Sequence, residues 1–446
     1  MAHVERLNRA PATGLAAAVL LATLGMAIPA IFGWDVHVRW FPPLHAIWEP
    51  RLGAGTLPAV LIGALTLWQG TALADRLPWR TLLVTAYAAG VGWMFSLALV
   101  DGLDGVGTIL DTDYEYLQTA RATSNLPATI AEYISRISYD GLPDTIQGAN
   151  WPVHLAGHPP GALTFFVLLD RIGLGSGLAA GIVVTLIAAS TAVAVLVTLR
   201  LLGAGDAARR AAPFLVIGPA AVWQSVSADA MFAAVAAWGI AALAAAAVHR
   251  KIGWGLLAGL LLGYAVMLSY GLPLLGLLAV AVLVVARNWR PLPWAVLGAL
   301  AVVGAYAALG FVWWEALPEL RERYYAGVAS NRPPAYWMWG NFSALVFSAG
   351  PIAGAAVAVL GRRVRDLELG DRSVRAVRWL AGAGLAMMVS ADLSQMSRAE
   401  VERIWLPFLP WLLVATSLLP SSWRRPALAV QVVVALAVQH LLDTGW

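Results

Sequence analysis

The chain has 446 residues, of which 60% are hydrophobic and only 12% are charged, and its mean hydropathy is +0.73. An ordinary soluble chain is about half apolar and about a quarter charged. The composition therefore excludes a disordered protein, a nucleic-acid-binding protein and a water-soluble enzyme, and leaves a polytopic membrane protein. The chain contains no cysteine, which excludes disulfides, thiolate metal sites and cysteine nucleophiles.

Thirteen apolar runs have lengths compatible with membrane spans, which need about 20 mostly apolar residues with some latitude for tilt. In chain order we predict spans near 13–33, 56–73, 80–101, 175–203, 211–226, 229–248, 252–270, 272–286, 292–314, 342–361, 376–392, 404–420 and 426–442. The sequence between them offers no soluble domain. We therefore predict an all-α polytopic membrane protein with about 13 transmembrane helices, in which residues 1–446 form a single transmembrane domain.

The basic residues set the predicted orientation, because cytoplasmic loops are enriched in arginine and lysine. With thirteen spans and a cytoplasmic N-terminus, the basic residues that flank the spans fall on one side: Arg6, Arg9, Arg76, Arg80, Arg200, Arg209, Arg210, Arg250, Lys251, Arg287, Arg290, Arg362, Arg363, Arg365, Arg372, Arg375, Arg424 and Arg425. The net charge of +4 thus reflects membrane topology. The composition is typical of a bacterial protein, and we expect a multi-pass protein of the plasma membrane.

The apolar segment 159–169 is too short to cross a bilayer. If it crossed, Arg200, Arg209 and Arg210 would lie outside, so we interpret it as a re-entrant or interfacial helix on the extracytoplasmic side. Two large outer loops result: residues 101–174, which contain most of the polar sequence, and residues 315–341, which are rich in aromatic side chains. We therefore expect the chemistry of the protein on its extracytoplasmic face.

Three carboxylates follow a span at the start of the first outer loop: Asp111, Asp113 and Glu115. Like charges this close raise one another's pKa, and perturbed carboxylates often mark functional sites. The group would serve as a general base, as a metal-binding group, or as both. The alternative is a solvated loop that happens to be acidic; we favour a functional site.

A histidine motif follows later in the same loop. His154 and His158 precede Pro159 and Pro160, and the two prolines fix the direction in which the next short helix begins. This places His158 at the head of that helix, where it can face a polar cavity. The alternative is a proline-stiffened loop with two surface histidines, an interpretation that suits His154 equally well.

Taken in order, these motifs resemble the GT-C superfamily of integral-membrane glycosyltransferases, in its bacterial, actinobacterial type. The resemblance rests on the Asp-x-x-Tyr stretch from Asp113 to Tyr116, on the His-Pro-Pro helix, and on three later stretches: Ser227 to Phe232, Lys251 to Tyr270, and Glu400 to Pro410. It touches most of residues 80–420. Two spans precede the matching part, and the paired Asp-Glu of the family stands here as Asp113-Tyr-Glu115.

The resemblance implies a GT-C-like fold and a hexosyl- or pentosyltransferase of cell-envelope biosynthesis. Such an enzyme moves a sugar from a polyprenyl-phosphate donor to a lipid, glycan or protein acceptor. The acceptor hydroxyl needs a carboxylate base, for which we favour Asp113 over Asp111 and Glu115. Arginine suits the donor phosphate, and Arg403 is the best placed. The other candidates for substrate binding are Tyr116, His154, His158 and Arg332, and a divalent metal ion stays open as a cofactor.

Two other classes of protein fit the composition. A transporter or lipid flippase usually has repeat symmetry and ionisable groups at the bilayer midplane, whereas here the polar sequence is concentrated in one outer loop. A non-catalytic scaffold of cell-envelope assembly keeps the hydropathy of the spans without needing the carboxylates. Asp113→Asn separates the scaffold, which tolerates the change, from the enzyme.

Overall fold

The structure is a computed structural model that describes residues 2–137, 150–365 and 371–445. Residues 138–149 of the predicted outer loop 101–174, residues 366–370 and the two terminal residues lie outside the described residues. The regular secondary structure of the described part is helical apart from a two-residue antiparallel ladder between β1 (Ile47–Trp48) and β2 (Leu442–Asp443). This confirms the predicted all-α architecture.

Six helices within the described residues are long and apolar enough to cross a membrane. They are α1 (Ala2–Phe32), the continuous run from α2 (Thr56–Leu65) to α3 (Thr71–Arg76), α4 (Trp79–Ala98), α10 (Gly177–Leu201), α13 (Ala228–His249) and α21 (Arg372–Leu393). Two bent pairs raise the number to eight if each is one span: α16 (Leu292–Ala308) with α17 (Trp313–Ala326), and α19 (Pro334–Ala349) with α20 (Ile352–Arg365). The polytopic character is supported, and the count of thirteen stays a prediction.

Three of the predicted spans show where a helix breaks inside an apolar run. The span at 211–226 breaks between α11 (Gly205–Val216) and α12 (Ala221–Gln224), and the span at 342–361 contains a bend of 107° between α19 and α20. The span at 404–420 divides into α22 (Val401–Ile404), α23 (Leu409–Leu413) and a 3₁₀ turn at Val414–Leu418. Hydropathy located these apolar runs correctly, but it does not account for the prolines within them. A proline removes a backbone hydrogen-bond donor and disfavours the helical conformation of the residue before it.

The sharper bend, between α19 and α20, requires a glycine. Gly350 has a φ of +72°, which side chains disfavour. A Cβ at this position would lie 1.6 Å from Oε1 of Gln431 in α24 (Ser421–Leu441). Gln431 donates from Nε2 to the carbonyl oxygen of Ala349 at 2.8 Å, so α24 satisfies a carbonyl that the broken helix leaves open.

Helix α13 lies deepest in the bundle among the candidate spans. Its apolar window is 83% buried, compared with 17% for that of α1, and it packs against α10, α14 (Ile252–Leu268) and α15 (Leu275–Ala286). The helix is rich in alanine, and small side chains allow neighbouring helices to approach closely. The first turn of α13 is therefore a firmly held platform.

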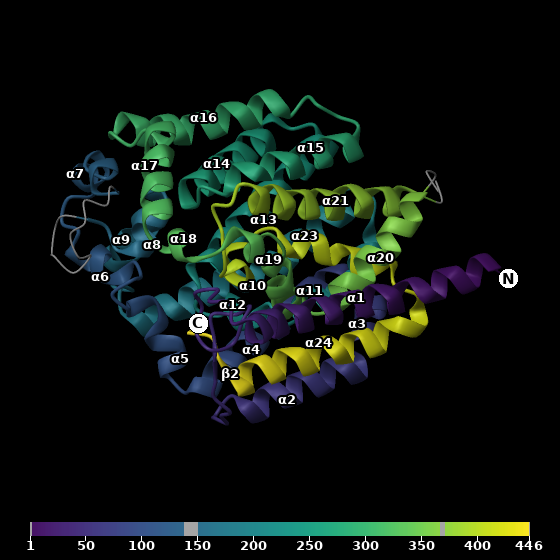
Figure 1. Cartoon of the computed structure of the whole chain (residues 1–446). Helices are drawn as coiled ribbons and strands as arrows, with labels where there is room; N and C mark the ends of the chain where they lie inside the picture. Colours follow the sequence, from purple (N-terminus) through teal and green to yellow (C-terminus); the bar gives the residue numbers. More distant parts are fainter. Residues whose placement is uncertain (1, 138–149, 366–370, 446) are drawn as a thin grey trace.

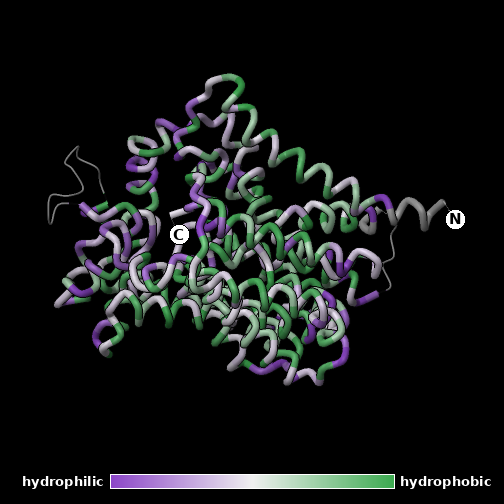
Figure 2. Tube along the Cα trace, turned by 90° about the horizontal axis from the view of Figure 1, so that it is seen from below, coloured by the Kyte–Doolittle hydropathy of each residue, from purple (hydrophilic) through white to green (hydrophobic). Residues whose placement is uncertain are grey.

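The short helices of the first outer loop gather at one end of the bundle, on the left in Figure 1, and the N-terminus of α1 lies at the opposite end. They are α5 (Asp104–Gly107), α6 (Leu117–Ala122), α7 (Leu126–Ala131), α8 (Val153–Gly157) and α9 (Gly161–Arg171). In Figure 2 hydrophobic stretches fill most of the body of the bundle. The segment interpreted as an interfacial helix is α9, and the second outer loop is mostly helical, with α17, α18 (Val328–Asn331) and the start of α19.

Candidate active site

A cluster of buried and half-buried charged and polar side chains lies where the first outer loop meets the first turn of α13 and the segment around α22. We call it the charged cluster; it consists of Glu115, Tyr116, His154, His158, Asp229, Arg332, Glu400, Glu402 and Arg403. Charged side chains are almost never buried without partners. Ion pairs and hydrogen bonds between oppositely charged members of the cluster offset the cost of their burial.

Four side chains of alternating charge form the centre of the cluster. Arg403 of α22 donates from Nη1 to Oδ2 of Asp229 at 2.5 Å, and its Nη2 lies 3.4 Å from Oε2 of Glu400. Arg332 donates from Nη2 to Oε1 of Glu400 at 2.7 Å. Burial acts to lower the pKa of Arg403, but Asp229 and Glu400 outweigh it and raise that pKa above its usual range. Arg403 therefore stays charged.

His158 connects this centre to the first outer loop. Its Nδ1 lies 2.8 Å from the carbonyl oxygen of His154 and 2.9 Å from the hydroxyl of Tyr116. Because a carbonyl only accepts, Nδ1 carries the proton, and Nε2 faces Oδ1 of Asp229 at 3.8 Å. Phe232, one turn along α13, packs its ring edge-on against the imidazole at 5.5 Å. Asp229 and Phe232, which lie on the same face of α13, thus both contact His158.

Glu115 and His154 form a second pair in the cluster. Oε1 of Glu115 accepts from Nδ1 of His154 at 2.7 Å. The glutamate is only 4% exposed, and its Oε2 has no hydrogen-bond partner among the described residues. A buried carboxylate oxygen without a partner costs free energy, so it is suited to accept a proton or a hydrogen bond from a substrate.

Tyr116, the residue after Glu115, packs into the protein interior beside it. Its ring stacks on Phe166 of α9 at 5.1 Å, and the side chain is fully buried. Burial raises the pKa of the Tyr116 hydroxyl well above its usual value, and the nearby Glu115 and Asp229 raise it further. Tyr116 therefore keeps its proton and acts as a hydrogen-bonding group rather than as a base.

The two glutamates on either side of Val401 have opposite protonation behaviour. Burial acts to raise the pKa of Glu400, but Arg332 and Arg403 outweigh it and lower that pKa to about 2. Burial raises the pKa of Glu402 to about 7, assisted by the negative charge of Glu400. Oε2 of Glu402 has no hydrogen-bond partner among the described residues. Glu402 is thus an acid that titrates near neutral pH.

The backbone beside this cluster is strained. Val226, three residues before Asp229, has a φ of +54°, and the consecutive residues Ala399 and Glu400 have φ values of +68° and +60°. A β-branched residue with positive φ is a genuine outlier. Side-chain bonds hold both segments in place: Thr185 Oγ1 accepts from the Val226 amide, and Asn341 Oδ1 accepts from the Ala399 amide. Such strain is found preferentially at functional sites.

The other two carboxylates of the acidic motif point to different partners. Asp111 forms an ion pair with Arg121, which also donates to the carbonyl oxygen of Gly175 at 3.1 Å. Asp113 is exposed, and its Oδ1 accepts from Gln118 at 2.9 Å. Of the three predicted carboxylates, only Glu115 is part of the charged cluster.

Four arginines of the second outer loop and of the segment around α22 divide into two groups. Arg332 and Arg403 are in the charged cluster. Arg398 donates to the carbonyl oxygens of Ala329 and Arg332, and Arg323 donates to those of Ile137 and Trp151. The latter two arginines tie backbone segments together.

Sequence reasoning did not select Asp229, Glu400 or Glu402 as site residues. The available signal for Asp229 was a carboxylate in the first turn of a long apolar helix, which is a functional suspect by default. Glu400 and Glu402 carried no separate signal beyond their position beside Arg403. Among the described residues, no three His, Asp or Glu side chains are arranged to hold a metal ion.

Comparisons with known proteins assign the chain to no family and add only one distant structural similarity. No protein-family model matches the chain, and no curated protein matches it. Among solved structures it is similar to ArnT from Cupriavidus metallidurans in the apo state, with 19% sequence identity and a TM-score of 0.39. The match covers 67% of this chain and 56% of that chain, so it spans little more than half the length of ArnT. An identity and a TM-score at these values assign no family.

Proposed function

We propose that the protein is a GT-C-type membrane glycosyltransferase of the bacterial plasma membrane. It transfers a sugar from a polyprenyl-phosphate donor to a hydroxyl of a lipid, glycan or protein acceptor, on the extracytoplasmic face. The observation that carries the proposal is the convergence of Glu115, His158, Asp229 and Arg403 at the end of a buried apolar helix. A carboxylate for the acceptor and an arginine for the leaving phosphate are the two groups that this transfer requires.

In this proposal Glu115 is the general base. Its buried Oε2 takes the proton from the acceptor hydroxyl, and the acceptor oxygen forms a bond to the anomeric carbon of the sugar. The bond between that carbon and the phosphate oxygen breaks, and the polyprenyl phosphate leaves with the bonding electrons. His154 holds the other oxygen of Glu115, which fixes the direction of the carboxylate. Asp113, favoured by the sequence motif, is exposed and is therefore our second candidate.

Arg403 stabilises the charge that develops on the leaving phosphate. Arginine binds phosphate through forked donors, and Asp229 and Glu400 hold its guanidinium in one orientation. A hydrogen-bond donor that is already held in position, as this guanidinium is, needs no reorganisation when the transition state forms. The lipid tail of the donor would remain among the apolar helices, because the charged cluster lies at the end of α13.

The test is transfer of radiolabelled sugar in membranes that contain the wild-type protein, Glu115→Gln, Asp113→Asn or Asp111→Asn. Polyprenyl-phosphate mannose, arabinose and glucose are offered in turn. We expect transfer from one donor, with a loss of about 10²- to 10⁴-fold in Glu115→Gln and little change in Asp113→Asn. Loss in Asp113→Asn with retention in Glu115→Gln would return the base to Asp113. Equal activity in all four proteins would refute a loop carboxylate as base.

A further inference from the structure

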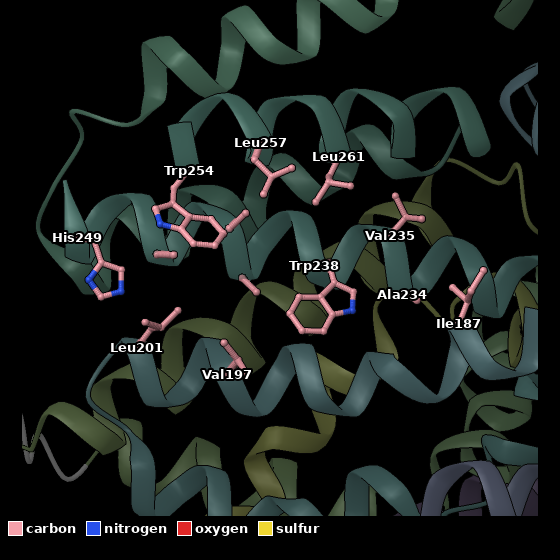
Figure 3. A pocket seen from close by; sticks show the side chains of 13 residues that line it. Ile187, Val197, Leu201, Ala234, Val235, Trp238, His249, Trp254, Leu257 and Leu261 are labelled. Atoms are coloured by element: carbon pink, nitrogen blue, oxygen red, sulfur yellow. The ribbon is translucent and has the colours of Figure 1, made fainter. Parts of the chain in front are cut away.

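An apolar groove lies along α13 beyond the charged cluster. It encloses about 480 Å³ between α10, α13 and α14 (Figure 3). Its walls include Val197 and Leu201 of α10, Trp238 of α13, and Trp254 and Leu257 of α14. No acidic residue is among the described residues that line it. In a bundle that crosses a bilayer, such a groove opens to hydrocarbon.

One polar atom of the groove wall, the indole nitrogen of Trp238, has a hydrogen-bond partner within the chain. The indole nitrogen of Trp238 donates to Oγ of Ser190 at 3.0 Å, although the side chain itself is 37% exposed. A buried indole usually needs such a partner, and here the chain supplies it internally. The groove therefore offers apolar contact along its length, which suits an alkyl chain.

The groove is long enough to hold one lipid chain. On α13 it extends from Ala234 to His249, which corresponds to about 22 Å at 1.5 Å per helical residue. One leaflet of a bilayer has about 15 Å of hydrocarbon. Figure 3 shows His249 and Trp254 at one end of the groove, and Ile187 and Val235 at the other. A chain that enters at His249 can therefore run from the headgroup level past the midplane.

Two basic residues follow His249, the residue at one end of the groove, directly in the sequence. His249 is followed directly by Arg250 and Lys251, and all three residues are exposed. Basic residues next to the ends of transmembrane helices attract anionic lipid headgroups. The charge at this end is thus complementary to a phosphate.

We propose that this groove binds one anionic phospholipid from the leaflet on the basic side of the bundle. One acyl chain lies along Trp238 between α10 and α14, and the headgroup phosphate lies at His249, Arg250 and Lys251. Asp229 is at the opposite end of α13, about 30 Å away along the helix. The lipid therefore does not compete with the charged cluster, and the site is independent of the proposed transfer reaction.

The test is native mass spectrometry of the detergent-solubilised full chain, titrated with phosphatidylglycerol or with phosphatidylcholine of the same acyl chains. Arg250→Gln/Lys251→Gln removes charge at the groove end. Arg76→Gln/Arg80→Gln is the matched control, because it removes two exposed basic residues from a predicted cytoplasmic loop that does not line the groove. Leu257→Trp narrows the groove from the exposed face of α14, and Ala242→Leu narrows it from α13.

We expect the wild type to bind phosphatidylglycerol more tightly than phosphatidylcholine. Arg250→Gln/Lys251→Gln should weaken the binding of phosphatidylglycerol by roughly 25-fold, about fivefold for each charge, while the control pair changes it little. Either groove-narrowing variant should reduce the binding of both lipids. Equal binding of the two lipids by the wild type, or an equal loss in the control pair, would overturn the proposal. So would binding unaffected by both narrowing substitutions, or a purified protein that retains an isoprenoid in place of a phospholipid.

Discussion

Arg403 and Asp229 are 174 positions apart in the chain, and their side chains meet at 2.5 Å with 7% and 4% of their side-chain surfaces exposed. The pair joins the segment around α22 to the first turn of the most buried candidate span. A buried ion pair contributes little net stability compared with apolar residues, but removal of one partner leaves an uncompensated charge. The pair therefore fixes the position of the arginine that we assign to the donor phosphate.

Asp229→Asn should destabilise the folded protein by about 3–5 kcal/mol, because Arg403 loses its shortest carboxylate contact while remaining buried. Arg403→Gln should cost a similar amount, and the double variant should cost less than the sum of the two. Denaturant unfolding of the purified protein in detergent measures all three. The control is Arg121→Gln, which breaks the more exposed pair with Asp111 and should cost about 0–1 kcal/mol. Additive losses at Asp229 and Arg403 would contradict a coupled pair.

The raised pKa of Glu402 predicts a pH dependence of stability. Its pKa is about 7 in the folded protein and near 4.5 in an unfolded chain, so the folded state holds a proton that the unfolded state has lost between these values. Stability should therefore fall as the pH rises from about 4.5 through about 7, and level off above that. Thermal melting of the wild type and Glu402→Gln between pH 5 and pH 8 measures this, and the variant should show a flatter profile.

Glu400→Gln provides the comparison for that experiment. The pKa of Glu400 is lowered to about 2, so its contribution to stability is fully present above about pH 4.5 and is lost as the pH falls towards 2. Glu400→Gln should thus lower the melting temperature throughout pH 5 to 8, with a smaller loss at the upper end, because the charge of Glu400 contributes to the raised pKa of Glu402. Parallel profiles for the wild type and Glu402→Gln would contradict the assignment of the titration to Glu402.

The fold was predictable from the sequence where a span is one uninterrupted helix. The runs at 80–101, 175–203 and 229–248 correspond to α4, α10 and α13 within a few residues, because hydropathy alone specifies such elements. Hydropathy did not predict the helix breaks at Gly218-Pro219, at Gly350-Pro351 and at the prolines after Trp405, because the chain stays apolar through each of them. Whether a bent pair crosses the bilayer once or twice depends on tertiary packing, such as the contact of Gln431 with the bend at Gly350.

The site was predictable only in part for a similar reason. The sequence drew attention to Glu115, His158 and Arg403, because unusual residue types stood at the edges of apolar runs. It favoured Asp113 over Glu115 as the base, since the two lie two positions apart and only the fold decides which one is buried. Asp229 and Glu400 join the cluster through contacts with residues distant in sequence, for which spacing along the chain gives no signal.

His154→Leu should lower kcat of sugar transfer by about 10- to 100-fold, the worth of one hydrogen bond to a charged group. His154 acts on Glu115 through Nδ1 and is a positioning residue, so KM for the donor should change little. His154→Asn keeps a donor near that position and should recover part of the lost rate. The measurement is steady-state kinetics on the three proteins with whichever sugar donor the transfer assay selects. A rise in KM without a fall in kcat would assign His154 to substrate binding instead.

Gly350→Ala should destabilise the protein by more than about 1–3 kcal/mol, the cost of holding a non-glycine residue in a disfavoured backbone region, because the added Cβ also collides with Gln431. Gln431→Ala in the same chain should relieve the collision but leave the backbone cost. The matched control is Gly361→Ala in α20, where a Cβ meets nothing within 4 Å and helix propensity favours alanine. Denaturant unfolding in detergent should therefore give the control a free energy of unfolding equal to or above that of the wild type. The double variant should be less stable than the wild type, and Gly350→Ala should be the least stable. A Gly350→Ala protein as stable as the control would show that the bend between α19 and α20 does not depend on this glycine.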